Sequence, residues 1–383
     1  MAIPRKLLYD DSAPVVLHCV SRLVRRLYLL ADESLRRMLV DRLRFLVTVF
    51  AIDVLEWAVL ENHFHVVLAT HPDLVALWSD REIAERFRAL CPDRAWRRRA
   101  NIPPGAPPQP EEIEDALARP QLIARWRRQL ASPSTFHKFL KQRIARLINE
   151  ADDVTGHCWE GRFKSIVALD DEAVVAHMVY VALNPVRAGM AEALDEYEFA
   201  SIGERVEDLK RRIRAGEFAG EAEAAREKLR AMRLVPALPC DPGSEATKIE
   251  TLANGLPNPW FGGRVPSVVE GASVVSFIAQ VEAAGRMRRL DKRGFIPDSA
   301  AGALAELDRA LAAAGSAAGG VLARALEIAG SLEEAMARGA WGTVSGGAAA
   351  LARHAKAMSR RFVLAIAGRR EDGFRRRVAA TSD

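Results

Sequence analysis

Two histidines separated by one bulky residue are the first group in this sequence that could do chemistry. His63 and His65 flank Phe64 in ENHFHVVLAT, residues 61–70. In an extended strand successive side chains point to opposite faces, so both imidazoles would share one face and Phe64 would occupy the other. The pair could converge on a metal ion. The alternative is a pair of hydrogen-bonded strand histidines, and a metal site needs a third ligand from elsewhere in the chain.

Tyr180 and Asn184 supply the partners that such a metal site would need. They stand four residues apart in DDEAVVAHMVYVALNP, residues 170–185, which predicts a helix capped by one of its first aspartates and stopped by Pro185. A spacing of four places both side chains on one helical face. The Asn184 amide oxygen could then be the third ligand, with Tyr180 one turn away as a nucleophile.

Each residue of this second group also has an ordinary structural interpretation. An asparagine before a proline is a common helix end, and a tyrosine on an amphipathic helix usually packs with its hydroxyl at the rim. His177, three residues before Tyr180, could replace a ligand, orient one or be a bystander.

The donor set indicates which metal would bind. Two imidazoles and a neutral carbonyl oxygen form a low-charge set with open positions, which suits Mg²⁺ or Mn²⁺ bridging to a phosphate better than a closed zinc site. The metal would polarise the phosphate and hold it in line for attack. A tyrosine, whose ordinary pKa is near ~10, needs this help to act as a nucleophile.

The segments around these residues predict a mixed α and β domain. Alternating or β-branched apolar runs predict four strands, at residues 13–22, 53–60, 63–70 and 161–169. Glu61 and Asn62 would join the second and third strands in a hairpin. Helical apolar spacing predicts helices at residues 32–50, 133–149 and 170–185, and a further helix is expected from after residue 74 to about residue 90. The prolines of residues 101–112 rule out regular structure across that stretch and indicate a loop or an insertion.

The length of 383 residues exceeds what one core usually supports, so two domains are expected. Residues 203–233 are charged and helical with little apolar face, which predicts a connector, and the chain beyond residue 245 is rich in alanine and glycine. We therefore expect a catalytic domain over 1–205 with a proline-rich insertion at about 100–112, a charged helical connector over 206–244 and a mostly helical C-terminal domain over 245–383.

Composition favours a polyanionic partner and an intracellular setting. The formal net charge is +5, and the basic residues are clustered, which makes nucleic acid a plausible partner. The four cysteines stand far apart without Cys-x-x-Cys spacing, which indicates free thiols in a reducing cytoplasm. The N-terminal segment lacks the apolar core of a signal peptide, and no apolar stretch reaches the ~20 residues of a membrane helix.

Three segments of the chain, in this order, resemble a known family. ENHFH, GHCWEGRFKS and YVALNPVRAGM are similar to motifs of the HUH-type single-tyrosine transposases, most closely the REP-associated tyrosine transposases of bacteria. The resemblance covers about residues 12–205 and continues more weakly over 278–297, as in longer members. It implies that Tyr180 is the nucleophile and that His63, His65 and Asn184 are the metal ligands.

The resemblance also implies a fold and a reaction. The fold would be α+β, a ferredoxin-like or RNA-recognition-like antiparallel sheet with packed helices. Tyr180 would attack a phosphate in single-stranded or hairpin DNA, form a 5'-phosphotyrosyl link and release a 3'-hydroxyl, so that the bond can be rejoined. A monomer or a homodimer with exchanged tyrosine helices would act in the cytoplasm, in association with the nucleoid.

Basic side chains are expected to hold the DNA phosphates. Those beside the motifs or on the helix over 133–149 are Arg162, Lys164, Lys138, Lys141, Arg143, Arg146 and Arg187. Trp96 and Trp126, within the basic segments 94–99 and 125–128, could stack on unpaired bases. The alternative is a solvated basic face with tryptophans that anchor it to the core.

Two departures from the family pattern leave other functions open. Leu60 and Glu61 stand where members usually have Met-Pro, and Glu61 could be a surface substitution or could repel phosphate. The proline-rich stretch from Asn101 is the second departure and looks like an insertion. The alternatives are a catalytically silent nucleic-acid-binding regulator on the same fold and a His-dependent metallophosphohydrolase. A covalent DNA adduct that Tyr180→Phe abolishes would distinguish the transposase from both.

Overall fold

The computed structural model of the protein describes seven segments of the chain. They are residues 12–243, 268–269, 271–288, 292–297, 299–300, 302–313 and 344–345. The first segment holds every residue predicted to act in catalysis or to bind metal. Most of the predicted C-terminal domain over 245–383 lies outside the described residues, and its boundaries stay a prediction.

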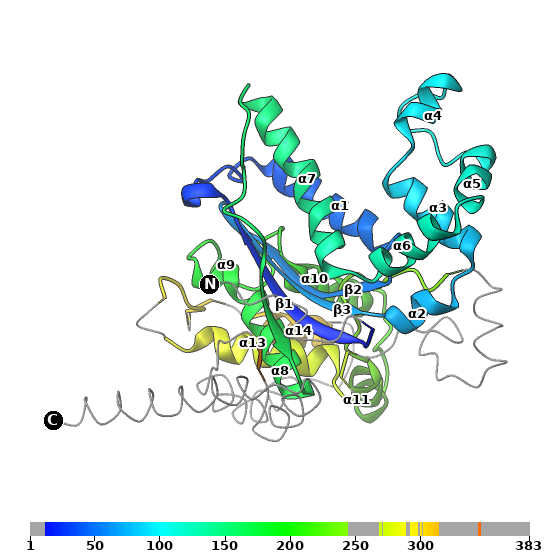
Figure 1. Ribbon diagram of the computed structural model, residues 1–383. Coiled ribbons are helices and arrows are strands. Elements are labelled where there is room, and N and C mark those ends of the chain that lie inside the picture. The colour runs from blue at the N-terminus through cyan, green and yellow to red at the C-terminus, as the bar shows by residue number, and fades with distance from the viewer. Residues whose placement is uncertain are drawn as a thin grey trace, which may run out of the picture.

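An antiparallel sheet of four strands forms the centre of the protein (Figure 1). Its strands are β1 (Val15–Arg22), β2 (Ile52–Val59), β3 (His63–Thr70) and β4 (Lys164–Ala168). Their order across the sheet is β2-β3-β1-β4, and every neighbouring pair is antiparallel. A two-residue strand, β5 (Val344–Ser345), pairs in parallel with β4. The four predicted strands and the hairpin through Glu61 and Asn62 are confirmed.

Helices cover both faces of this sheet, which explains why every residue of β2 is buried. α1 (Glu33–Val47) and α7 (Pro133–Ala151) pack together on one face, and α8 (Asp171–Ala182) lies against the other (Figure 1). The chain order β-α-β-β-α-β is the split βαβ arrangement of ferredoxin-like domains. The predicted α+β class, an antiparallel sheet with packed helices, is therefore confirmed.

Helix ends near the site fall where side chains can cap them. Asp32 accepts a hydrogen bond from the Ser34 backbone N–H at the start of α1, and Asp170 accepts one from Ala173 at the start of α8. Such caps satisfy amides that have no partner within the helix. A short 3-10 turn, η2 (Val24–Arg26), follows β1.

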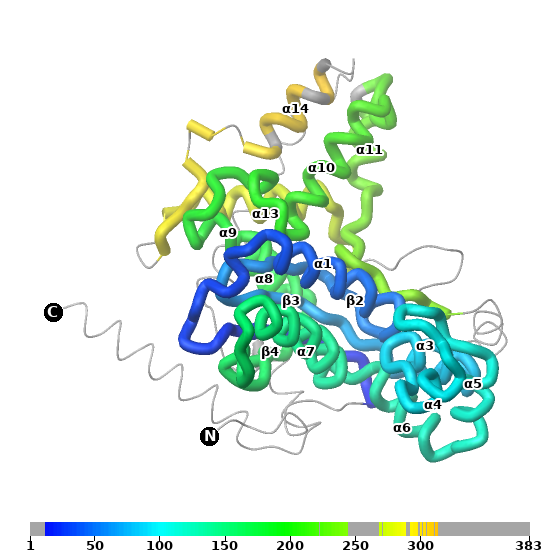
Figure 2. Tube along the Cα trace, turned by 90° about the horizontal axis from the view of Figure 1, so that it is seen from above, coloured from blue at the N-terminus to red at the C-terminus, as the bar shows by residue number. Residues whose placement is uncertain are grey.

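A group of helices between β3 and α7 lies at one end of the sheet (Figure 2). It consists of α2 (Pro72–Leu77), α3 (Asp80–Leu90), α4 (Arg94–Arg99), α5 (Pro110–Leu117) and α6 (Pro120–Leu130). The prediction that prolines exclude regular structure across 101–112 is wrong at its end, because Pro110 occupies the first turn of α5. Proline is tolerated there, since that turn needs no backbone donor.

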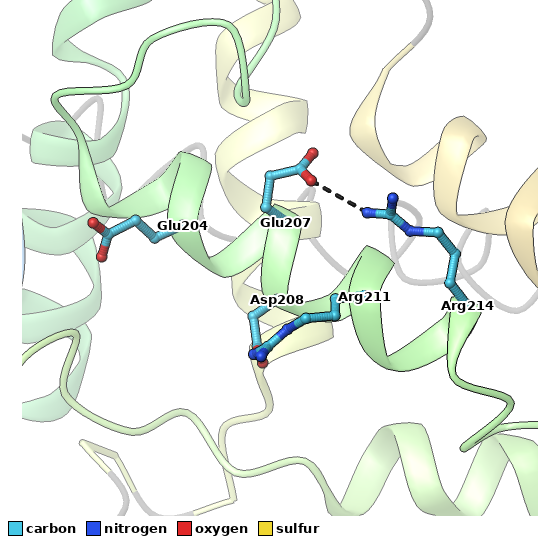
Figure 3. A pocket seen from close by; sticks show the side chains of 5 residues that line it. All are labelled: Glu204, Glu207, Asp208, Arg211 and Arg214. Atoms are coloured by element: carbon cyan, nitrogen blue, oxygen red, sulfur yellow. Dashed lines mark hydrogen bonds and ion pairs between the residues drawn. The ribbon is translucent and has the colours of Figure 1, made fainter.

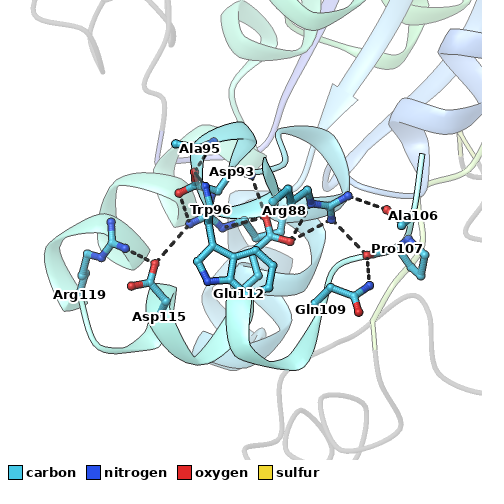
Figure 4. Close-up of polar contacts among 11 residues, drawn as sticks. Arg88, Asp93, Ala95, Trp96, Ala106, Pro107, Gln109, Glu112, Asp115 and Arg119 are labelled. Atoms are coloured by element: carbon cyan, nitrogen blue, oxygen red, sulfur yellow. Dashed lines mark hydrogen bonds and ion pairs between the residues drawn. The ribbon is translucent and has the colours of Figure 1, made fainter. Parts of the chain in front are cut away.

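The core of this helical group is polar as well as apolar (Figure 4). The fully buried Glu112 carboxylate accepts hydrogen bonds from the Arg97 guanidinium at 3.0 Å and from the Asp93 backbone N–H at 2.7 Å. Trp126 is 4% exposed and stacks on Phe87, with ring centroids 4.6 Å apart. The expectation that Trp126 stacks on DNA bases is therefore wrong, and Arg97 of the basic segment 94–99 serves the core instead of a phosphate.

Further helices lie on the side of the sheet that α8 covers (Figure 1). They are α10 (Ser201–Arg214), α11 (Ala222–Ala231), α13 (Val274–Arg286) and α14 (Ala303–Ala313). The α13 helix packs against α8, and α14 packs against α10 and α13. Among the described helices, none combines the length and apolar character needed to cross a membrane.

The α10 helix is fixed to β2 by a buried ion pair. The Glu56 carboxylate, which is fully buried, accepts hydrogen bonds from Arg205 at 3.0 Å and from the Ser201 hydroxyl at 2.5 Å. Burial raises the pKa of Glu56, and Arg205 partly opposes that rise. Val206 and Leu209 are buried beside them. The prediction of little apolar face over 203–233 is therefore wrong for α10.

Candidate active site on the histidine face

Strand register places both predicted histidines on one face of the sheet. Directly paired residues of antiparallel strands point to the same face. His63 is paired with Arg22 and His65 with Val20, so the next residue of that β1 series, His18, also belongs to this face. The rings of His63 and His65 have centroids 4.9 Å apart. We call this side of the sheet the histidine face.

Hydrogen bonds at the Nδ1 atoms orient both imidazoles. His65 Nδ1 lies 2.9 Å from His18 Nε2, and His63 Nδ1 lies 2.6 Å from the side-chain oxygen of Asn62. Because the Asn62 oxygen can only accept, His63 carries its proton on Nδ1 and presents a lone pair on Nε2. If His18 Nε2 accepts the hydrogen bond from His65, then His65 likewise carries its proton on Nδ1. Orientation of this kind is typical of metal-ligating histidines.

The predicted nucleophile lies against these histidines. The half-buried Tyr180 ring has its centroid 5.7 Å from that of His65 and 5.6 Å from that of His18. One turn earlier on α8, the His177 ring lies 5.2 Å from the His18 ring. The structure therefore brings His65 and Tyr180 together, although 115 positions separate them, and adds His18 and His177 to the group.

Asn184 is joined to the turn that carries Tyr180. The Asn184 Nδ2 donates a hydrogen bond of 2.9 Å to the Tyr180 carbonyl oxygen, so Oδ1 is the amide atom that can serve as a ligand. The predicted uninterrupted helix is wrong in detail, because α8 ends at Ala182 and Asn184 begins the short α9 (Asn184–Arg187). Leu183 keeps a helical backbone, with φ −83° and ψ −5°, which preserves the spacing of one turn.

Burial keeps the histidines of this face neutral. It lowers the pKa of His18 to about 3, with a contribution from His177, and the pKa of His177 itself to about 4. Burial, together with the charges of Arg22 and Arg26, lowers the pKa of His63 to about 4. The pKa of His65 falls well below its ordinary value, first because of burial. Neutral imidazoles retain the lone pairs that a metal ion needs.

Cationic side chains surround the histidine face and would favour an anionic ligand. Arg22 is paired with His63 across β1 and β3, and Lys292 acts electrostatically on His65. Exposed Lys164 of β4 is paired with Val20, so it belongs to the same face. Neither Arg22 nor Lys292 was among the predicted DNA-binding residues, although Lys292 lies in the weakly similar segment 278–297.

The basic residues of α7 lie on the opposite face. His137 of α7 stacks on Phe64, with centroids 6.1 Å apart, and Phe64 points away from the histidine face. The predicted DNA-binding residues of α7 are thereby separated from the histidines by the sheet: Lys138, Lys141, Arg143 and Arg146. Lys141 also donates a hydrogen bond of 2.5 Å to the Gly161 carbonyl oxygen.

Of the two remaining predicted DNA contacts, one is exposed and the other is hydrogen-bonded within the protein. Arg162 is exposed beside β4. The Arg187 guanidinium donates hydrogen bonds to the carbonyl oxygens of Ala284 at 2.6 Å and Met287 at 2.8 Å. Because these carbonyls lie at the end of α13, Arg187 joins α9 to α13.

A hollow on α10 is a weaker candidate site (Figure 3). It is lined by Glu204, Glu207, Asp208, Arg211 and Arg214. Its charges pair with one another, as Arg214 does with Glu207 at 3.4 Å and Arg211 with Asp208. Internal pairing of exposed charges is typical of a solvated helix surface.

No protein-family model matches this chain, and no curated protein matches it. Among solved structures, the chain is similar to a REP-associated tyrosine transposase bound to a REP hairpin. The sequence identity is 15% and the TM-score is 0.31, with 54% of this chain and 86% of that chain covered. A likeness at this level assigns no function to this chain.

Proposed function

We propose that the protein is a metal-dependent transesterase of the HUH transposase type, which cleaves and rejoins single-stranded DNA through a phosphotyrosyl link at Tyr180. The observation that carries the proposal is the meeting of a tyrosine and neutral histidines on one face of the sheet. The Tyr180 and His65 ring centroids are 5.7 Å apart. Cations near this face would attract a polyanion.

His63, His65 and Asn184 are the residues that would hold Mg²⁺ or Mn²⁺. The two Nε2 atoms and the Asn184 Oδ1 form a neutral nitrogen and oxygen set, which fits a divalent ion that keeps positions open for phosphate oxygens. When bound, such an ion polarises the phosphate and orients it for in-line displacement. His18 would hold the His65 ring in its ligating tautomer through the 2.9 Å contact.

The reaction proposed for Tyr180 is a phosphoryl exchange. The Tyr180 oxygen forms a bond to phosphorus while the bond from phosphorus to the 3'-oxygen breaks. The phenol proton is lost to solvent, and the leaving 3'-oxygen takes up a proton to become a hydroxyl. The 5'-phosphotyrosyl link has the same bond type as the starting phosphodiester, so the 3'-hydroxyl of a DNA end can reverse the step.

The test is formation of a covalent adduct with labelled single-stranded hairpin DNA in the presence of Mg²⁺ or Mn²⁺. The full chain should form a denaturant-stable adduct, and Tyr180→Phe should form none. Tyr28→Phe is the matched control, because Tyr28 is 62% exposed and outside the site. DNA binding without any adduct would support the regulator, and phosphate release without an adduct that persists in Tyr180→Phe would support the phosphohydrolase.

A further inference from the structure

Three side chains with metal-binding atoms meet at the far end of the histidine strand. They belong to Asp53 near the start of β2, His71 directly after β3, and Cys240 in the segment after α11. One ligand atom from each lies within 4.8 Å of the other two. His71 follows His65 by six residues, which corresponds to roughly 20 Å along an extended strand. This cluster is therefore separate from the candidate active site.

Backbone pairing fixes the three residues in place. Asp53 of β2 is paired with Ala69 of β3, and His71 continues the Ala69 series, so both side chains share a face. The segment around Leu238 forms a bridge with Val54 of β2. Cys240 follows two residues later, and its backbone N–H donates a 2.7 Å hydrogen bond to the Asp53 carboxylate. Strand pairing and this hydrogen bond together bring the three side chains close to one another.

The cluster combines burial with access. Asp53 and Cys240 are each 2% exposed, whereas the His71 side chain is 18% exposed. His71 Nε2 lies 2.8 Å from Asp53 Oδ2. The partial exposure of His71 gives this otherwise buried cluster contact with solvent.

A nucleophilic cysteine is the alternative for a Cys-His-Asp group, and the surroundings of Cys240 oppose it. Burial and the neighbouring Asp53 carboxylate raise the pKa of the Cys240 thiol well above its ordinary value. A reactive cysteine needs a lowered pKa and access to substrate. Cys240 is 2% exposed, so its thiol is not accessible to a substrate, which opposes a nucleophilic role.

We infer that Asp53, His71 and Cys240 form a second metal site, which takes Zn²⁺ or a similar borderline-soft divalent cation. A thiolate, an imidazole and a carboxylate are zinc ligands, and three of them leave a fourth position for water. Zinc bonds of about 2.0–2.3 Å in a tetrahedron place ligand atoms about 3.3–3.6 Å apart. The Asp53 and His71 atoms, now 2.8 Å apart, would separate by roughly half an ångström to admit the ion.

Binding of zinc exchanges a thiol proton for the metal. The Cys240 Sγ–H bond breaks, the sulfur–metal bond forms, and the proton leaves to solvent. His71 keeps one proton by carrying it on Nδ1 while Nε2 binds the metal. The ion would then join the start of β2, the end of β3 and the segment around residue 240. It would thereby stabilise the junction between the sheet and the chain that follows α11.

The test uses Co²⁺ as a spectroscopic probe of the chelator-treated full-length protein. One equivalent of Co²⁺ should produce a thiolate-to-metal charge-transfer band, which Zn²⁺ then abolishes by displacement. Cys240→Ser should lack the band, whereas Cys91→Ser should retain it because Cys91 is exposed and outside the cluster. Absence of the band in the wild-type protein, or its persistence in Cys240→Ser, would overturn the inference.

A second variant tests the site in case Cys240→Ser does not fold. His71→Gln keeps the thiol and should weaken Co²⁺ binding, so that more than one equivalent is needed to saturate the band, with circular dichroism as the check on folding. Zn²⁺ should raise the Tm of the wild-type protein and of Cys91→Ser but not of His71→Gln. An equal rise in all three proteins would contradict the site. His65→Ala should keep the thiolate band, which separates this site from the proposed active site.

Discussion

Lowering the pH from 7 to 5 is expected to weaken the fold through the histidines that gather on the histidine face. In the folded protein burial lowers the pKa of His18 to about 3 and the pKa values of His63 and His177 to about 4. In the unfolded chain each imidazole has its ordinary pKa of 6.5. As the pH falls below 6.5, the unfolded state therefore binds protons that the folded state does not bind, and the free energy of unfolding decreases.

The magnitude follows from the difference between the two pKa values. Each such histidine lowers the free energy of unfolding by about 1.36 kcal/mol per pH unit below 6.5, until the folded pKa is reached. At pH 5 this amounts to about 2 kcal/mol for one histidine and about 6 kcal/mol for His18, His63 and His177 together. A domain typically has about 5–15 kcal/mol in total, so the loss is a large share of it.

Urea denaturation at pH 7 and at pH 5 measures this loss. Other groups titrate in the same interval, so the comparison of variants isolates the histidines. His177→Asn should lose about 2 kcal/mol less than the wild-type protein between the two pH values. His157→Asn, at an exposed position, should lose as much as the wild-type protein. Equal losses in His177→Asn and the wild-type protein would refute the reasoning.

Three further predictions test other parts of the structure. His18→Asn should weaken Mn²⁺ binding by about 10–100-fold in calorimetry, because the orienting contact is lost, and an unchanged affinity would contradict that role. Arg205→Leu should lower the free energy of unfolding by about 3–5 kcal/mol by leaving the Glu56 carboxylate buried and unpaired, and adding Glu56→Leu should restore part of it; no restoration would refute the ion-pair explanation. Lys164→Ala should reduce the affinity for single-stranded DNA in fluorescence anisotropy, and the slope of log K against log salt concentration should become less steep by about 0.7. Arg146→Ala, on the opposite face, should change neither the affinity nor the slope. Equal effects would show that DNA does not distinguish the two faces.

Local patterns predicted the strands and helices around the site because neighbouring residues largely determine them. The apolar segments on both sides of Glu61 and Asn62 identified the hairpin, and the aspartates at residues 170 and 171 marked the start of α8. The histidine pair could be predicted for the same reason. Alternation within one strand places His63 and His65 on one face, independently of the rest of the fold.

Features that depend on distant partners could not be predicted in this way. His18 meets His65 only through the pairing of β1 with β3, and nothing in the residues around it signals that contact. The basic face of α7 could be predicted from the sequence, but its position on the side of the sheet opposite the histidine face could not. Cys240 and Asp53 are hydrogen-bonded across 187 positions, so their meeting depends on the path of the chain after α11.

The mass of the peptide that carries Tyr180, after reaction with hairpin DNA and nuclease digestion, tests the central claim most directly. The proposed mechanism predicts a nucleotide attached through phosphate to Tyr180, only when Mg²⁺ or Mn²⁺ is present, and none in His65→Ala. An unmodified Tyr180 across a panel of hairpins with both metals, or a nucleotide attached to another residue, would contradict it.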